Sequence, residues 1–142
     1  MAPHLRGMKS ANEVMGLGIK AARGAGFDIG QAADFGAALV IHLCEGRNTA
    51  EITAALADPD GPITGMPARI DALYDPNESG QDLFTGLALS YFQASQGARP
   101  KPRLLLPKSL EAELTTLAAK TYVPASDGSR LAGAGASLLD ND

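Results

Sequence analysis

Residues 10–44 decide the fold and read SANEVMGLGIKAARGAGFDIGQAADFGAALVIHLC. Ser10 and Glu13 have the spacing of a capping box, in which each side chain accepts a hydrogen bond from the backbone amide of the other. Apolar residues then recur at helical spacing, so a helix is predicted over about 11–23. Gly24 has the position of the left-handed residue that commonly ends a helix.

A second helix is predicted over about 29–44, with Asp28 as its N-cap. Its second half is apolar nearly all round, which is typical of a buried helix. Four small residues let the first helix approach closely, and they are Ala32, Ala33, Gly36 and Ala37. We therefore interpret residues 10–45 as a helical hairpin.

The middle of the chain predicts shorter helices. Asn48 to Glu51 has the pattern of another capping box and opens a helix to about Ala57. Pro67 suits a first helical position, which predicts a helix over 67–74 with Ile70, Leu73 and Tyr74 inward. A stronger helix is expected over 81–96, with an apolar stripe of core type formed by Leu83, Phe84, Leu87, Ala88, Tyr91 and Phe92.

The two ends of the chain are interpreted differently. Residues 1–9 are expected to be a loose lead-in. Residues 103–107 are expected to be extended chain laid on the core, since no strand partner is evident for them. Ser109 is predicted to cap a last helix over 110–120, with its inward face formed by Leu110, Leu114, Leu117 and Ala118.

The fold class predicted is mostly α, as one domain spanning residues 1–142. Its parts are the hairpin at 10–45, a variable middle at 46–109, and a final helix with an ordered tail at 110–142. A chain of 142 residues with 45% apolar residues is long enough to bury a core of its own.

The charge distribution argues against nucleic-acid binding, because the net charge is −4 and the pI is about 5.1. Residues 51–98 carry one basic and seven acidic side chains. Such a segment forms either a solvated face or a docking surface for a basic partner. Cys44 is the one cysteine in the sequence, which favours a reducing compartment. No apolar run approaches the length of a membrane span, so we expect a cytoplasmic protein without a membrane partner.

The sequence predicts no metal site and no cofactor. His42 and Cys44 are two positions apart, and on a helix such side chains diverge. His42 is interpreted as a partly buried helix residue with its ring hydrogen-bonded, and Cys44 as a structural thiol. The glycine pairs do not have the full spacing of a nucleotide-binding loop.

The terminal segment 121–142 carries the predicted ligand site. Arg130 offers five donors to a carboxylate or phosphate, and Ser126, Ser129 and Tyr122 add hydroxyls nearby. The alternative interpretation is that Tyr122 and Arg130, with carboxylates near the end of the chain, tie the tail to the body. On that interpretation the tail is a structural strap.

Two stretches resemble a bacterial domain-of-unknown-function family, family 3726. The first is Ser10-x-Asn-Glu-Val with Lys20-Ala-Ala-Arg-Gly-Ala-Gly-Phe27, and the second is the Tyr-x-Pro-Ala-Ser…Ser-Arg-x-x-Gly-Ala-Gly segment that begins at Tyr122. The match covers about 8–45 and 110–142, and it implies that the middle is a shortened version of the family's. The resemblance implies no activity, but it adds Asn12, Glu13 and Arg23 to the candidate ligand-binding residues.

The function predicted is therefore a non-catalytic cytoplasmic module: an accessory subunit or a small-anion binder. The partners expected are another protein or a second copy of the chain, or a small carboxylate or phosphate. The alternative is a small metabolic enzyme that holds a substrate carboxylate through Arg130 and uses Glu13 or Tyr122 as acid or base.

Overall fold

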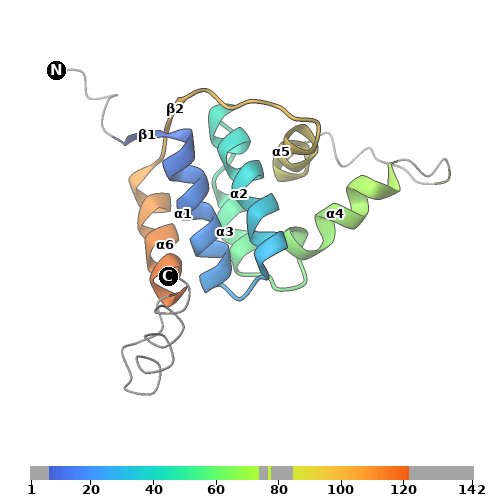
Figure 1. Ribbon diagram of the computed structural model, residues 1–142, viewed down its shortest axis with the longest axis horizontal. Coiled ribbons are helices and arrows are strands. Elements are labelled where there is room, and N and C mark those ends of the chain that lie inside the picture. The colour runs from blue at the N-terminus through green and yellow to red at the C-terminus, as the bar shows by residue number, and fades with distance from the viewer. Residues whose placement is uncertain (1–6, 74–76, 78–84, 122–142) are drawn as a thin grey trace, which may run out of the picture.

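The computed structural model describes residues 7–73, 77 and 85–121. The elements are, in order, β1 (Met8–Ser10), α1 (Ala11–Gly24), α2 (Ile29–Cys44), α3 (Ala50–Leu56), α4 (Pro62–Ala72), α5 (Gly86–Ser95), β2 (Arg103–Leu105), α6 (Lys108–Ala118) and the 3₁₀ helix η3 (Ala119–Thr121). The helices dominate this part of the chain (Figure 1), which confirms the prediction of a mostly α single domain. The tail that follows η3 lies outside the described residues.

The predicted helical hairpin is confirmed, and α1 and α2 begin where the sequence places them. Ser10 Oγ accepts from the Glu13 amide at 3.0 Å, and Glu13 Oε1 accepts from the Ser10 amide at 3.2 Å. Asp28 and Gln31 make the same reciprocal pair at the start of α2, at 2.7 and 3.0 Å. Each box satisfies amides that the first turn of a helix leaves without partners.

Small residues let α1 and α2 come close, as predicted, although not all four of those named take part. Gly36 and Ala32 are buried, whereas Ala33 is exposed. A Cβ added at Gly18 would lie 2.6 Å from Leu39 Cδ2, and one added at Gly36 would lie 2.7 Å from a side-chain carbon of α1. Gly18 lowers helix propensity, but its position requires the absence of a side chain.

The interpretation of Gly24 as a left-handed terminating residue is wrong. Gly24 is the last helical residue of α1, and Gly26 takes the positive φ of 104° in the turn instead. A Cβ at Gly24 would overlap the carbonyl oxygen of Leu117 in α6. Gly24 is therefore a close-packing residue, because α6 lies directly against the end of α1.

The last helix, α6, begins two residues earlier than a Ser109 cap predicts. Its N-cap is Pro107, which has an extended ψ of 140° and whose carbonyl accepts from the Glu111 amide at 2.8 Å. Ser109 therefore lies inside the helix. The predicted inward face is confirmed for Leu110 and Leu114, which are buried.

The short strands correct two expectations about the ends. Residues 8–10 are not a loose lead-in, and residues 103–105 do have a partner, because the two segments pair antiparallel with Lys9 opposite Leu104. Leu106 donates to the Gly7 carbonyl at 2.9 Å, which extends the ladder. This pairing joins distant parts of the chain, so no local pattern signals it.

Helix α3 lacks the predicted capping box. Its N-cap is Thr49, and the Asn48 side chain accepts from the Ala50 amide at 2.9 Å. Glu51 does not turn back to its own helix. Its Oε2 accepts instead from the Leu87 amide at 3.0 Å, in the first turn of α5, so a tertiary contact replaces the local one.

Helix α4 begins at Pro62, and the prediction that it begins at Pro67 is wrong. Pro62 occupies the first helical position, and Pro67 lies inside the helix, where it has no amide to donate to the preceding turn. Ile63 and Met66 are buried. They anchor residues 62–66, the first turn of α4, which the sequence-based prediction placed before the helix. Burial of these two side chains explains why the helix tolerates Pro67.

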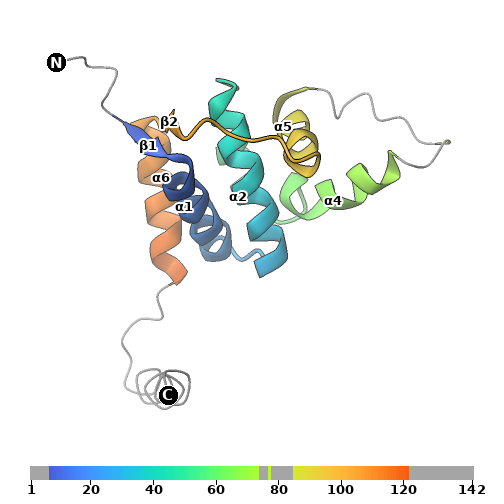
Figure 2. The same cartoon turned by 45° about the horizontal axis from the view of Figure 1, so that its top comes forward.

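Helix α5 begins at Gly86, because Thr85 is its N-cap and has an extended backbone, so the predicted start at residue 81 is wrong. Residues 81–84 of the predicted helix lie outside the described residues. Leu87 and Tyr91 of the predicted stripe are buried. After α5 the chain crosses over α2 to β2 (Figure 2).

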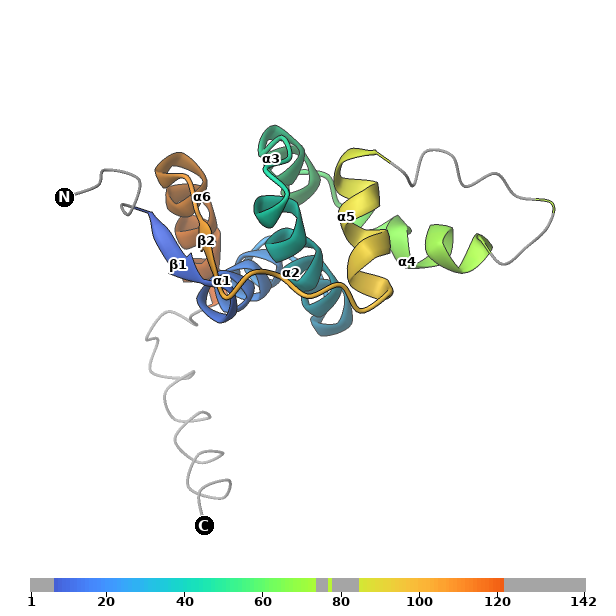
Figure 3. The ribbon, with the colours of Figure 1, turned by 90° about the horizontal axis from the view of Figure 1, so that it is seen from above.

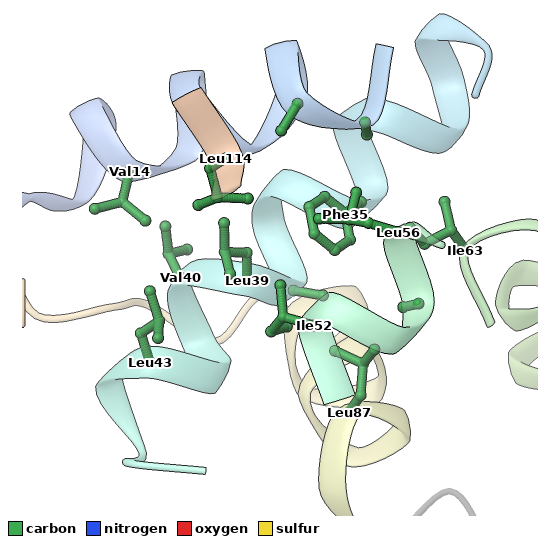
Figure 4. Close-up of a cluster of buried hydrophobic side chains, with 14 of the residues drawn as sticks. Val14, Phe35, Leu39, Val40, Leu43, Ile52, Leu56, Ile63, Leu87 and Leu114 are labelled. Atoms are coloured by element: carbon green, nitrogen blue, oxygen red, sulfur yellow. The ribbon is translucent and has the colours of Figure 1, made fainter. Parts of the chain in front are cut away.

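The core lies between α1, α2 and α6, with α3 and α5 on the other face of α2 (Figure 3). Phe35 and Leu39 of α2 are fully buried at its centre. Figure 4 shows Leu39 between Leu114 and Ile52, and Phe35 beside Leu56. Helix α2 is thus the central helix, as its apolar sequence predicts.

Candidate functional site

The structure separates the predicted site residues. Asn12 and Glu13 lie in the first turn of α1, and Arg23 lies in its last turn. Eleven residues of helix place Asn12 and Arg23 about 16 Å apart along the axis. The other four predicted residues, Tyr122, Ser126, Ser129 and Arg130, lie outside the described residues.

The three described residues have local contacts. Hydrogen bonds from Ser10 lower the pKa of Glu13, because they favour the charged carboxylate that caps the helix. Arg23 donates from Nη1 to the Phe27 carbonyl at 3.2 Å, which ties the turn between α1 and α2. Asn12 borders a shallow hollow of about 420 Å³ between α1 and α6.

A buried polar network joins α2 to α5. His42 is fully buried, its Nδ1 lies 2.8 Å from Ser90 Oγ, and its Nε2 lies 2.8 Å from the Asn48 carbonyl oxygen. Because a carbonyl only accepts, Nε2 carries the proton and donates. Nδ1 of the neutral ring then accepts from the Ser90 hydroxyl.

Arg47 completes this network from the turn after α2. Its Nη1 donates to Ser90 Oγ and to Gln93 Oε1, both at 2.8 Å. Burial lowers the pKa of His42, since the charged ring would lose its hydration, although the Asn48 carbonyl and Glu51 oppose this effect. His42 is therefore neutral at physiological pH, more deeply buried than the sequence indicated and hydrogen-bonded as predicted.

The network has the residue types of a hydrolytic triad but not its geometry. Ser90 is fully buried, so a substrate carbonyl does not reach its hydroxyl. Glu51 lies 3.9 Å from His42 Nε2, which instead donates to Asn48. The arrangement acts as a clamp between α2, the α2–α3 turn and α5.

A second arrangement combines a cavity with Tyr91, whose buried hydroxyl has no hydrogen-bond partner in the described part of the chain. The cavity has a volume of about 220 Å³ and lies between α2, α4 and α5. We call it the Tyr91 pocket, and its lining residues are Asp34, Ala37, Pro67, Ile70, Asp71, Tyr91, Ala94 and Ser95. In Figure 3, α4 and α5 lie on the side of α2 away from α6.

Tyr91 gives this pocket its chemistry. Its side chain is 3% exposed, and its hydroxyl oxygen is buried without a hydrogen-bond partner among the described residues. Burial and the nearby Asp34 carboxylate raise the pKa of the phenol, so it stays protonated at physiological pH.

The other lining groups divide into charged and apolar ones. Asp34 of α2 and Asp71 of α4 are exposed at the edge of the pocket. The Ser95 hydroxyl donates to the Phe92 carbonyl at 2.6 Å. The other lining residues, Ala37, Pro67, Ile70 and Ala94, are aliphatic.

The sequence missed this pocket because its residues were assigned to other roles. Tyr91 was placed in a core stripe, which is correct for its ring but says nothing about its hydroxyl. Pro67 was placed at the start of a helix rather than in a pocket wall. The available signal was Asp34, an acidic residue in an otherwise nearly uncharged helix.

The described residues contain neither a metal-binding cluster nor a membrane-spanning helix. Across the ranges given above, no group of three His, Cys, Asp or Glu side chains is arranged to hold a metal ion. None of the described helices combines the length and apolar character needed to cross a membrane.

Comparison with protein-family models, with curated proteins and with solved structures found no match to this chain. The resemblance to family 3726 rests on the residues quoted above and stays a prediction. The candidate site is accordingly argued from its own geometry.

Proposed function

We propose that this chain is a non-catalytic helical module that binds a small ligand in the Tyr91 pocket. The observation that carries the proposal is the cavity of about 220 Å³ between α2, α4 and α5. Its lining combines aliphatic residues with Tyr91 and with the acidic residues Asp34 and Asp71. Ligand pockets in proteins are commonly mostly apolar with a few polar groups.

The size of the pocket supports a small ligand. Pockets for drug-sized molecules measure about 300–1,000 Å³. The volume of about 220 Å³ is below that range. The clamp around His42 supports a non-catalytic role, because His42 and Ser90 are occupied in holding α5 against α2.

The proposal includes a cytoplasmic location and a partner protein. The cytoplasm suits a chain whose single cysteine forms no internal disulfide. An accessory-subunit role is tested by isolating the tagged chain from its native host and identifying what accompanies it. A chain recovered alone and monomeric would contradict that part of the proposal.

Small-anion binding through Arg130 remains a second proposal, and it includes the alternative of a small enzyme. It is supported by the guanidinium and the serine hydroxyls near it in the sequence. Arg130→Ala should remove thermal stabilisation by carboxylates or phosphates without changing the stability of the free protein. If these anions do not stabilise even the wild type, the second proposal is wrong.

The test of the Tyr91 pocket is a screen of small fragments by two-dimensional NMR. We expect binders to shift the amide signals of Tyr91 and Ala94. Ala37→Leu should abolish these shifts, because Ala37 lines the pocket. Ala112→Leu is the matched control, since Ala112 is exposed on α6, far from the pocket. Fragments that fail to shift any pocket signal would contradict the proposal.

A further inference from the structure

We infer that residues 131–139 of this chain dock in an apolar groove between α3 and α6, independently of the Tyr91 pocket. The groove has a volume of about 430 Å³. Its lining residues are Thr53, Leu56, Ala57, Ala112, Glu113, Thr116 and Leu117. The docking segment belongs to the part of the chain that follows η3 and lies outside the described residues.

The groove is lined mainly by aliphatic side chains. Leu56 of α3 is buried, and Leu117 of α6 packs against the core. Ala57 at the end of α3 and Ala112 of α6 are exposed. Covering apolar surface of this kind removes it from water, which is favourable. The groove therefore suits an apolar occupant.

The position of η3 brings the rest of the chain to this groove. Leu117 lines the groove, and the described chain ends only four residues later, at Thr121. Helical rises of 1.5 and 2.0 Å per residue place Thr121 about 15 Å beyond Ala112 along the helix axis. Residues 122–130 span up to about 30 Å when extended, so they are long enough to carry the next segment back along α6.

The sequence after η3 contains both a turn signal and an apolar segment. Asp127-Gly128 is a dipeptide typical of turns, which suits a reversal of chain direction. Residues 131–139 read LAGAGASLL and carry no charge. The groove volume corresponds to about fourteen water-sized groups, which leaves room for several leucine side chains.

The charges around the groove are compatible with this segment. Glu113 is the charged lining residue, and its carboxylate accepts from Thr53 Oγ1 at 2.8 Å. An acidic occupant would be repelled by this carboxylate. Arg130 immediately precedes the uncharged segment and Asp140 follows it, so the segment can lie with its basic end toward Glu113.

The covalent connection favours this segment over a separate protein. Effective concentrations across short linkers are on the order of millimolar. A separate partner or a second copy of the chain also loses translational and rotational freedom when it binds. We therefore assign the groove to the chain's own residues 131–139, which gives the structural strap a specific surface.

The experiment is paramagnetic NMR on the full chain. A nitroxide is attached to Ser137→Cys in a Cys44→Ser background, so that the label has a single site. We expect the nitroxide to broaden the amide signals of Ala57, Ala112 and Thr116 more strongly than those of α5. Groove signals that are not broadened in this way would overturn the inference.

Two variants of the labelled chain form a matched pair on α6. Thr116→Glu puts a charge in the groove, whereas Thr115→Glu puts the same charge beside the hollow between α1 and α6. Both threonines are exposed. We expect the broadening of groove signals to be lost in the first variant and kept in the second, because a charge disfavours an apolar contact. Equal broadening in both variants would contradict docking in this groove.

A second measurement needs no label. Leu138→Ser combined with Leu139→Ser in the full chain should shift the amide signals of Ala57 and Ala112, because the apolar contact is removed. Groove signals that stay unchanged in this variant would also overturn the inference.

A mixed sample tests whether another copy occupies the groove. Isotope-labelled chains without the nitroxide are combined with unlabelled chains that carry it. Broadened groove signals in this sample would overturn the inference and show that the segment of a second copy docks there, whereas sharp signals would support docking within one chain. None of these outcomes concerns the Tyr91 pocket, which is tested by its own fragment screen.

Discussion

The two sides of this molecule are packed by different means. On one side, α6 approaches α1 so closely that Gly24 has no room for a side chain beside Leu117. On the other side, α4 and α5 meet α2 around a cavity of about 220 Å³ with a buried phenol in its wall. The first side is closely packed, whereas the second side leaves a cavity between its helices.

The largest effect that this comparison predicts concerns the central helix. Phe35→Ala should lower the free energy of unfolding by about 3–5 kcal/mol, since it removes a fully buried ring. Ile70→Ala on α4 should cost only about 1 kcal/mol, because Ile70 is half-buried beside the pocket. Urea unfolding of both variants measures the difference. Similar losses would mean that the two sides contribute equally.

The next effect tests the close approach of α1 and α6. Gly24→Ala should destabilise the protein by about 1–3 kcal/mol, because the new Cβ overlaps a backbone oxygen of α6. Gly16→Ala is the matched control in the same helix, where a Cβ meets no atom within 4 Å. That control should stabilise the helix by about 0.5–1 kcal/mol. A gain at both positions in urea unfolding would show that the helices are not in close contact.

A smaller effect concerns the clamp that holds α5 against α2. Burial lowers the pKa of His42 in the folded protein, so the unfolded chain binds the proton more readily. Stability should therefore fall as the pH drops from about 7.5 to about 5.5, by at most about 1.4 kcal/mol per pH unit. Glu51 favours the charged ring and Arg47 opposes it, and both face His42.

Urea unfolding across this pH range checks the prediction, with His42→Gln as the comparison. The variant lacks the titrating ring, so its stability should change less over the same range. An equal pH dependence in both proteins would show that His42 is not the group responsible.

The sequence predicted the tightly packed side better than the open one. Ser10, Glu13 and Asp28 carry their helix-start signals within a few residues, so α1 and α2 begin where expected. Glu51 carried a similar local signal, but its carboxylate caps α5 instead. Local patterns succeed where the competing partners are also local, and they fail where a distant amide is available.

The candidate site was harder to predict for the same reason. An apolar stripe correctly indicates that the Tyr91 ring is buried, but burial of its hydroxyl without a partner depends on the packing of three helices. Pro67 lines the pocket because α4 begins at Pro62 and not at Pro67. The burial of Ile63 and Met66 fixes that helix start. The anion site predicted around Arg130 lies outside the described residues and stays a prediction.

The measurement that tests the central claim most directly is the fragment screen by two-dimensional NMR, run on wild type and on Ala37→Leu. We predict fragments that shift the amide signals of Tyr91 and Ala94 in wild type but not in the variant, whose larger side chain fills the pocket. Fragments that shift no pocket signal in wild type, or that shift these signals equally in the variant, would contradict a binding role for the Tyr91 pocket.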